Sequence, residues 1–146
     1  MNKKDLTPKF GWDSETGMAT CILTDGKSVY IGSAKCCYKD KDMQNEKTGC
    51  EIALMRAEIN YFQSIKKNEL IPSLNTLKEI QFTLNQCNTD SKSKEIVRRK
   101  IHRIENDLAV VRYLIAEKEQ SLTEYISAKD TFYKQVRKNR KKDKSK

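Results

Sequence analysis

The stretch that decides the fold is Lys94–Tyr133, KEIVRRKIHRIENDLAVVRYLIAEKEQSLTEYISAKDTFY, which contains neither glycine nor proline. Apolar residues recur along it at the three- and four-residue spacing of a helix that buries one face. They are Val97, Ile101, Ile104, Leu108, Val111, Ile115 and Leu122. With N-cap candidates in the polar run just before it, this pattern predicts a second helix over about 91–133. At about 1.5 Å per residue, its Lys94–Tyr133 part alone would be about 60 Å long.

A first helix is predicted before it, over about 48–86. Thr48 and Glu51 fit a capping box, in which the two side chains satisfy early backbone donors of the helix. Apolar residues then follow at helical spacing as far as Leu84. Pro72 lacks a backbone donor and disfavours helical geometry at Ile71, so we expect a kink or a brief break in the helix there.

Two long helices joined by a short turn must run antiparallel. The apolar stripe of the second helix is widened by Val110, Tyr113 and Leu114, which lie outside a single seam. One partner helix cannot bury all of these residues. We therefore expect the hairpin to assemble through its helices into a homo-oligomer.

The first third of the chain predicts strands, at about 9–36. It holds all five glycines and short alternating runs such as 20–24 and 28–31. Asp25-Gly26 lies between those two runs and favours a tight type I′ hairpin turn. The expected fold class is α+β, with a small antiparallel β-meander packed on the long antiparallel two-helix hairpin.

Charge divides the chain into a near-neutral body and a basic end. Residues Lys134–Lys146 hold eight Lys or Arg and one acid, within a net charge of +9. Of the 29 basic and 20 acidic residues, the body keeps 21 and 19. We expect one domain over 1–133 and a disordered basic tail over 134–146.

Cysteine usage favours a reducing cytosol. The five cysteines are odd in number, and the N-terminal sequence MNKKDLTPKF lacks the apolar core of a signal peptide. No window approaches about eighteen apolar residues, so we expect no membrane partner.

Metal and catalytic chemistry are poorly supported by the residues. Cys36, Cys37 and Cys50 offer three sulfurs in unsuitable spacing, and the chain has one histidine. The loop 40–42 begins like a calcium site but lacks its later ligands. His102 stands between two arginines, which offer no carboxylate to orient it as a general base. The sequence predicts no catalytic residue, no metal and no cofactor, and hence no enzyme.

A basic cluster surrounds the start of the second helix and favours a phosphate ligand. It comprises Lys92, Lys94, Arg98, Arg99, Lys100 and Arg103. Arg99 and Arg103 are one helical turn apart, so their guanidinium groups share a face suited to phosphate. Phe82 is a candidate stacking ring and Asn85 a candidate polar contact, both just before the turn. A solvated basic face remains the alternative.

The basic end over 134–146 has two open interpretations. It contacts the phosphates of nucleic acid without sequence preference, or it only keeps the chain soluble.

Short motifs in the first half of the chain resemble a family of bacteriophage proteins. They are Gly17-Met-Ala-Thr, Asp25-Gly-Lys, Gly32-Ser-Ala-Lys-Cys36, Thr48-Gly49 and Ile52-Ala53-Leu-Met-Arg56-Ala57. These motifs resemble those of anti-Thoeris sponge proteins, which sequester the cyclic ADP-ribose signal of a bacterial defence system. The resemblance covers about residues 15–60 by motif and extends to about 135 by element layout.

The resemblance implies a non-enzymatic protein of the host bacterial cytosol, whose helices assemble a dimer or a higher oligomer such as a hexamer. Its ligand would be a cyclic ADP-ribose isomer held between subunits, with cyclic oligonucleotides at separate sites in some members. Arg56 is the one ligand candidate that the motifs carry over, and pairing of Arg56 with Glu58 or the sheet is its alternative role. Arg99, Arg103 and Arg112 are candidates from charge alone. The rival functions are nucleic-acid binding through 134–146 and a purely structural assembly role.

Overall fold

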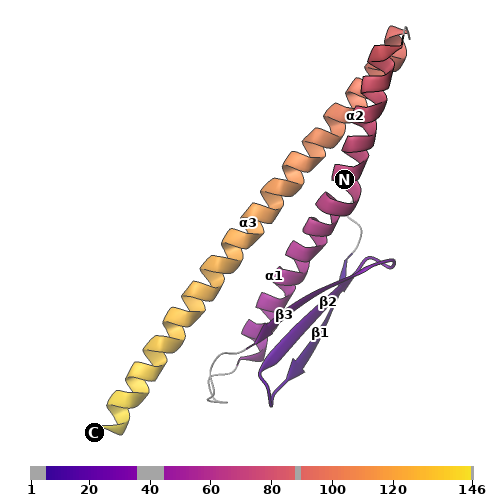
Figure 1. Cartoon of the computed structure of the whole chain (residues 1–146). Helices are drawn as coiled ribbons and strands as arrows, with labels where there is room; N and C mark the ends of the chain where they lie inside the picture. The colour runs from indigo at the N-terminus through magenta and orange to yellow at the C-terminus, as the bar shows by residue number, and fades with distance from the viewer. Residues whose placement is uncertain (1–5, 36–44, 88–89, 146) are drawn as a thin grey trace. The chain divides into compact units, whose positions relative to one another are not determined.

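The computed structural model describes residues 6–35, 45–87 and 90–145, in an α+β fold (Figure 1). The elements are β1 Thr7–Asp13, β2 Met18–Thr24, β3 Val29–Lys35, α1 Glu46–Ser64, η2 Ile65–Leu70, α2 Ile71–Gln86 and α3 Ser91–Lys144. The α+β class predicted from the sequence is therefore confirmed. The described residues form two compact units, one over 61–116 and the other over 6–60 with 117–145. Both long helices, α1 and α3, contribute residues to each unit.

The three strands form an antiparallel meander in the order β1-β2-β3, as predicted. β1 pairs with β2 from Thr7↔Thr24 to Asp13↔Met18, and β2 pairs with β3 from Met18↔Lys35 to Thr24↔Val29. Because facing residues of an antiparallel pair share a side of the sheet, the register fixes which residues meet α1. The expected end of the last strand at Cys36 lies outside the described residues.

The two turns of the meander are held by aspartates. The Asp13 carboxylate accepts the Glu15 N–H at 3.0 Å, and Gly17 closes the first turn at φ 70°. In the second turn, the Asp25 carboxylate accepts the N–H groups of Lys27 at 2.9 Å and Ser28 at 2.8 Å. Gly26 alone has positive φ there, at 88°. The type I′ prediction is wrong, because a longer loop over 25–28 is stabilised by the Asp25 side chain.

One side of the sheet packs closely on α1. The core of this unit is formed by Ala19, Cys21, Leu23, Ala53 and Ala57, with Trp12 and Tyr30 packed against it. Gly32 lies where the backbones approach most closely: a Cβ placed there would be 2.0 Å from the Ala53 carbonyl oxygen. Small residues at these positions therefore set the distance between sheet and helix.

Helix α1 begins earlier than expected. Asn45 is its N-cap, and the Asn45 Oδ1 accepts the N–H of Thr48 at 3.1 Å. Thr48 is buried inside the first turn. The prediction of a capping box at Thr48 is therefore wrong. The N-cap is Asn45, three residues earlier, and Asn is an equally good N-cap residue.

Two side chains of α1 hold the outer backbone of β3. Arg56 Nη1 donates to the Ser33 carbonyl at 2.7 Å, and Asn60 Nδ2 donates to the Ile31 carbonyl at 2.7 Å. These donors are one helical turn apart, and their acceptors are two residues apart along the strand. Arg56 thus has the sheet-pairing role that was its alternative in the sequence.

Polar contacts join α1 to the second half of α3 within the same unit. Lys118 Nζ lies 2.6 Å from Glu58 Oε2, and both side chains are partly buried. The Tyr125 hydroxyl donates a hydrogen bond to the Glu51 carboxylate. Burial, followed by that carboxylate, raises the pKa of Tyr125 to about 12, against an opposing contact from Thr48.

The raised pKa of Tyr125 predicts a loss of stability in strong alkali. Because the folded protein holds this proton more tightly than the unfolded chain does, the stabilisation is complete below pH 10 and disappears as pH rises toward 12. Denaturant unfolding at pH 9 and pH 11 should show that Tyr125→Phe weakens this pH dependence. The same loss of stability between pH 9 and pH 11 in the wild type and in the variant would contradict this role of Tyr125.

In the 61–116 unit, the helical chain changes register before Pro72. Over Ile65–Leu70 the backbone is a π-helix, and the Ile71 N–H reaches back to the Lys66 carbonyl. Ile71 keeps helical geometry at φ −63° and ψ −48°. Pro72 then occupies the first turn of α2, where its missing N–H costs little. The irregularity expected at Pro72 therefore takes the form of a widened turn before it.

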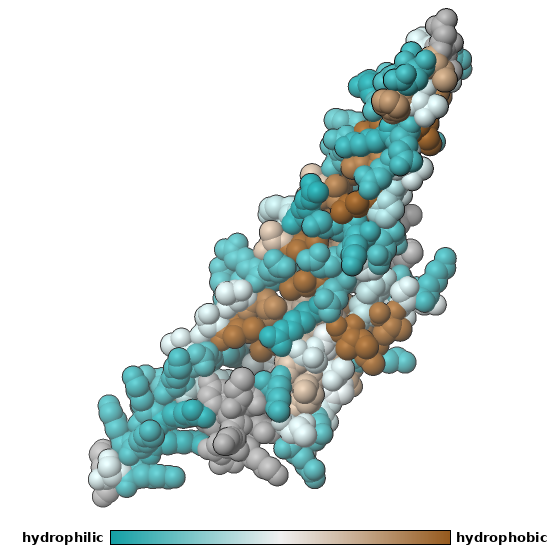
Figure 2. Space-filling view, in the orientation of Figure 1, coloured by the Kyte–Doolittle hydropathy of each residue, from teal (hydrophilic) through white to brown (hydrophobic). Residues whose placement is uncertain are grey.

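Two apolar clusters hold this unit together. The first joins Ile65, Val111 and Ile115, and the second joins Leu74, Ile101 and Leu108. All of the α3 members belong to the stripe that the sequence predicted. Apolar side chains gather along the helices in Figure 2.

Helix α3 continues to Lys144, beyond the predicted end at Tyr133. The prediction of a disordered tail over 134–146 is therefore wrong for residues 134–144, which are helical. No glycine or proline interrupts the helix there, and Lys134 pairs with Asp130 at 3.0 Å. Among the described residues, no helix is both long and apolar enough to cross a membrane.

Candidate functional site

The candidate site lies where α2 ends and α3 begins, within the 61–116 unit. α2 stops at Cys87, which is extended at φ −94° and ψ 150°. α3 then starts with Asp90 as its N-cap, whose carboxylate accepts the Ser93 N–H at 2.8 Å. That backbone hydrogen bond lowers the pKa of Asp90. Residues 88–89 lie outside the described part of the chain.

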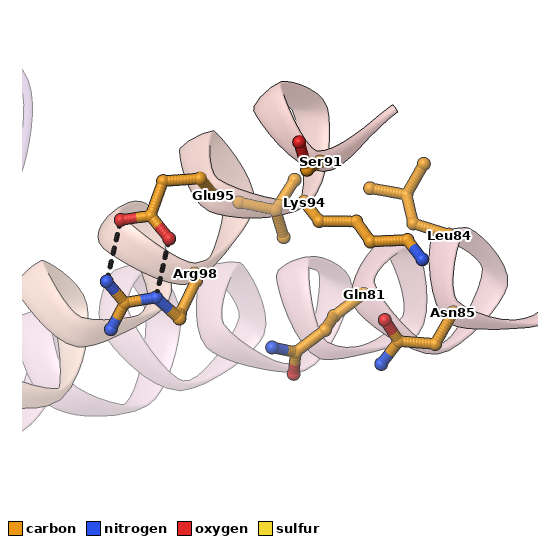
Figure 3. Close-up of a pocket in the computed structure, with 8 residues that line it drawn as sticks. Gln81, Leu84, Asn85, Ser91, Lys94, Glu95 and Arg98 are labelled. Carbon is orange, nitrogen blue, oxygen red and sulfur yellow. Dashed lines mark hydrogen bonds and ion pairs between the residues drawn. The ribbon is translucent and has the colours of Figure 1, made fainter. Parts of the chain in front are cut away.

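A pocket of about 200 Å³ opens between these two helix ends (Figure 3). Gln81, Leu84 and Asn85 come from α2. The α3 side is lined by Ser91, Lys94, Glu95, Val97 and Arg98. Among the described residues, the pocket therefore combines two side-chain amides, two cations, one carboxylate and one hydroxyl with the apolar side chains of Leu84 and Val97.

Glu95 is the electrostatic centre of this pocket. Arg98 binds its carboxylate with two hydrogen bonds, at 2.8 Å from Nε and 2.6 Å from Nη2. Arg99 Nε adds a third at 3.1 Å. The hydrogen bonds from Arg98, more than those from Arg99, lower the pKa of Glu95 to about 2. Glu95 therefore stays ionised and makes a poor general base near neutral pH.

Lys94 is the cation of the pocket that does not pair with Glu95. It is half-buried and lines the pocket, and its ammonium reaches toward the side formed by Leu84 and Asn85 (Figure 3). Among the described residues, Lys94 has no ion pair. An anion entering the pocket would meet this ammonium together with the amide groups of Asn85 and Gln81.

The predicted site residues are only partly brought together. Asn85 lines the pocket, and Arg99 contacts it through Glu95. Phe82, Arg103 and Arg112 are exposed and are not among its lining residues. Arg56 belongs to the other unit and bonds to β3.

Sequence reasoning missed Gln81 and Glu95, and it left Lys94 and Arg98 out of the ligand set. The spacing of Glu95 to Arg98 and Arg99 was a usable signal, because carboxylate and guanidinium groups three and four residues apart meet on a helix. It would have shown that Arg99 is partly neutralised. The contribution of Gln81 depends on how α2 packs on α3, which no local pattern encodes.

A second, more open hollow lies on the sheet. Its lining includes one acid and one base, Asp13 and Lys35, and none of the predicted site residues. Within the described residues, no group of three or more His, Cys, Asp or Glu side chains is placed to hold a metal ion. Burial raises the pKa of the Cys21 and Cys50 thiols, which disfavours their thiolate forms.

No family model matches the chain, and neither does any curated protein or solved structure.

Proposed function

We propose that this chain binds and sequesters a cyclic nucleotide signal, a cyclic ADP-ribose isomer, without degrading it. The observation that carries the proposal is the half-buried Lys94, which lines the pocket beside Asn85 and forms no ion pair with any other described residue. Its ammonium offers up to three donors to a pyrophosphate, and the two amides offer donors and acceptors to ribose or base. The motifs that resemble anti-Thoeris sponges over 17–57 support the choice of ligand.

Sequestration rather than turnover fits the charges in the pocket. Among the described residues, Glu95 is the one carboxylate that lines the pocket, and its two arginine partners hold it ionised. Such a carboxylate accepts protons poorly at neutral pH, so it offers little to hydrolysis of a phosphoanhydride. Binding alone suffices for a sponge, which needs affinity and copy number.

The size of the pocket supports a site completed by a second copy. A cavity of about 200 Å³ is smaller than the 300–1,000 Å³ typical of pockets that enclose small molecules. The same unit exposes large apolar side chains on its helices, among them Phe82 at 67%, Val110 at 51% and Tyr113 at 66%. Burial of these residues between chains would give the homo-oligomer, a dimer or higher, and would close the pocket over a ligand.

Replacing Lys94 by glutamine should reduce affinity for a cyclic ADP-ribose isomer by about tenfold or more. A hydrogen bond to a charged group contributes about 1.5–3 kcal/mol, and 1.4 kcal/mol corresponds to a factor of ten. Lys92→Gln removes the same charge from the same helical turn, yet Lys92 does not line the pocket, so it should change affinity by less than about twofold. Isothermal titration of the full chain measures both.

The same samples test the remaining parts of the proposal. Ligand released by denaturation should be chemically unaltered, and recovery of a hydrolysed product would overturn sequestration. At a hundredfold excess over Kd, a true ligand should add about 2.7 kcal/mol of apparent stability. Sedimentation at micromolar concentration should give the mass of a dimer or larger, and a monomeric mass contradicts the shared site.

A further inference from the structure

The C-terminal end of α3 carries a concentration of positive charge that the proposed nucleotide site does not use. Seven of the basic residues in 134–144 lie on helical backbone, and all are exposed. They are Lys134, Arg137, Lys138, Arg140, Lys141, Lys142 and Lys144. Hydrophilic side chains cover this end of the helix in Figure 2. This segment is about 16 Å long at 1.5 Å per residue.

Four of these lysines are available to a ligand and share one face. Lys138, Lys141, Lys142 and Lys144 have no ion pair within the described part of the chain, whereas Lys134 is paired with Asp130. At about 100° per residue, the four lie within an arc of roughly 160°. We call them the terminal lysine face.

The opposite face of the same turns has a different character. Phe132, Val136, Asn139 and Asp143 follow one another there at helical spacing, and Asp143 is the one acid in the segment. A helix that lies on a membrane needs a continuous apolar face opposite its cations, and two apolar residues do not make one. The arrangement therefore favours a polyanion in water over a lipid surface.

Helical order makes the terminal lysine face better suited to binding than a disordered tail. Lysines four residues apart, such as Lys138 and Lys142, repel each other by a few tenths of a kcal/mol on a helix. A string of phosphates laid along the face would relieve this repulsion. Because the backbone is already ordered, binding would not incur the entropy cost of forming the helix.

We propose that the terminal lysine face binds the phosphate backbone of nucleic acid without sequence preference. Its lysines are the phosphate contacts, and a helix about 11 Å across fits the major groove, which is about 12 Å wide. Four contacts predict that the affinity for duplex DNA falls about a hundredfold between 50 and 200 mM salt. This binding is independent of Lys94 and of the nucleotide pocket.

The test measures fluorescence anisotropy of a labelled random-sequence duplex of about 20 base pairs with the full chain. The variant Lys138→Gln/Lys141→Gln/Lys142→Gln/Lys144→Gln should lose more than tenfold in affinity at 100 mM salt and show a shallower salt dependence. Glutamine has nearly the helix propensity of lysine, so α3 should persist.

A matched control removes four exposed lysines elsewhere, through Lys9→Gln/Lys27→Gln/Lys67→Gln/Lys78→Gln. Both quadruple variants lower the net charge from +9 to +5. The control should keep its affinity within about twofold. Equal losses in the two variants would mean that total charge, not this face, drives binding, and would overturn the proposal. Binding to anionic phosphatidylserine vesicles but not to the duplex would overturn it in favour of a membrane.

Discussion

Replacing Gly32 by alanine should lower the free energy of unfolding by about 3 kcal/mol. The added Cβ would lie 2.0 Å from the Ala53 carbonyl oxygen and 2.4 Å from the Ala57 nitrogen. Both are backbone atoms of α1, so no side-chain rotation removes the overlap, and β3 must separate from the helix. Chemical denaturation of the variant measures the loss directly.

Gly11→Ala is the matched control in the same sheet. A Cβ at Gly11 meets nothing within 4 Å, and an alanine there is better suited to a strand than glycine. We expect it to leave stability unchanged or to raise it by less than about 1 kcal/mol. Fluorescence of Trp12, the sole tryptophan, adds a local readout because its ring packs against the same core. Equal stability of the two variants would contradict the close approach of β3 to α1.

The second large effect is expected at Val111 in the other unit. Val111 is fully buried among Ile65, Ile115 and their neighbours. Val111→Asp would place a carboxylate in this apolar cluster without a partner, so we expect a loss of about 4 kcal/mol or more.

Val110→Asp gives the comparison, because it makes the same chemical change one residue away on α3. The Val110 side chain is 51% exposed. Its aspartate stays in water, so the intrinsic stability of the chain should fall by less than about 1 kcal/mol. Circular dichroism during urea titration, at a protein concentration low enough to keep both variants monomeric, separates the two. Similar urea midpoints for Val111→Asp and Val110→Asp would mean that the buried face of α3 is wrongly identified.

The sequence predicted the elements better than their ends. Alternation located β2 and β3 through the runs 20–24 and 28–31, and the stripe from Ile101 to Ile115 identified the buried face of α3. The cap of α1 was misassigned because Asn45 and Thr48 have nearly equal intrinsic preference for that position, and tertiary burial of Thr48 decides between them. The end of α3 was misplaced because charge density was taken as disorder, although no helix-breaking residue occurs there.

The candidate site was harder to predict than the fold. Asn85 was identified from its place beside the turn, but the pocket depends on three-dimensional pairing between helix ends. Arg99 was predicted to bind the ligand because of its charge. Its hydrogen bond to Glu95 shows that a positive charge alone does not tell whether a side chain is available to a ligand. Lys94 becomes a candidate only when the structure shows that Glu95 pairs with Arg98 and Arg99, and that Lys94 has no ion pair with any other residue it describes.

The hydrogen bonds from Arg56 and Asn60 to β3 also protect the molecule against aggregation. A three-stranded sheet has two edges, and an exposed edge invites strands from other molecules to pair with it. On β3, the carbonyls of Ser33 and Ile31 are already occupied by α1 side chains, so an incoming strand finds them taken. On β1, Pro8 has no amide hydrogen to offer. Both edges of the sheet thereby discourage its extension into fibrils.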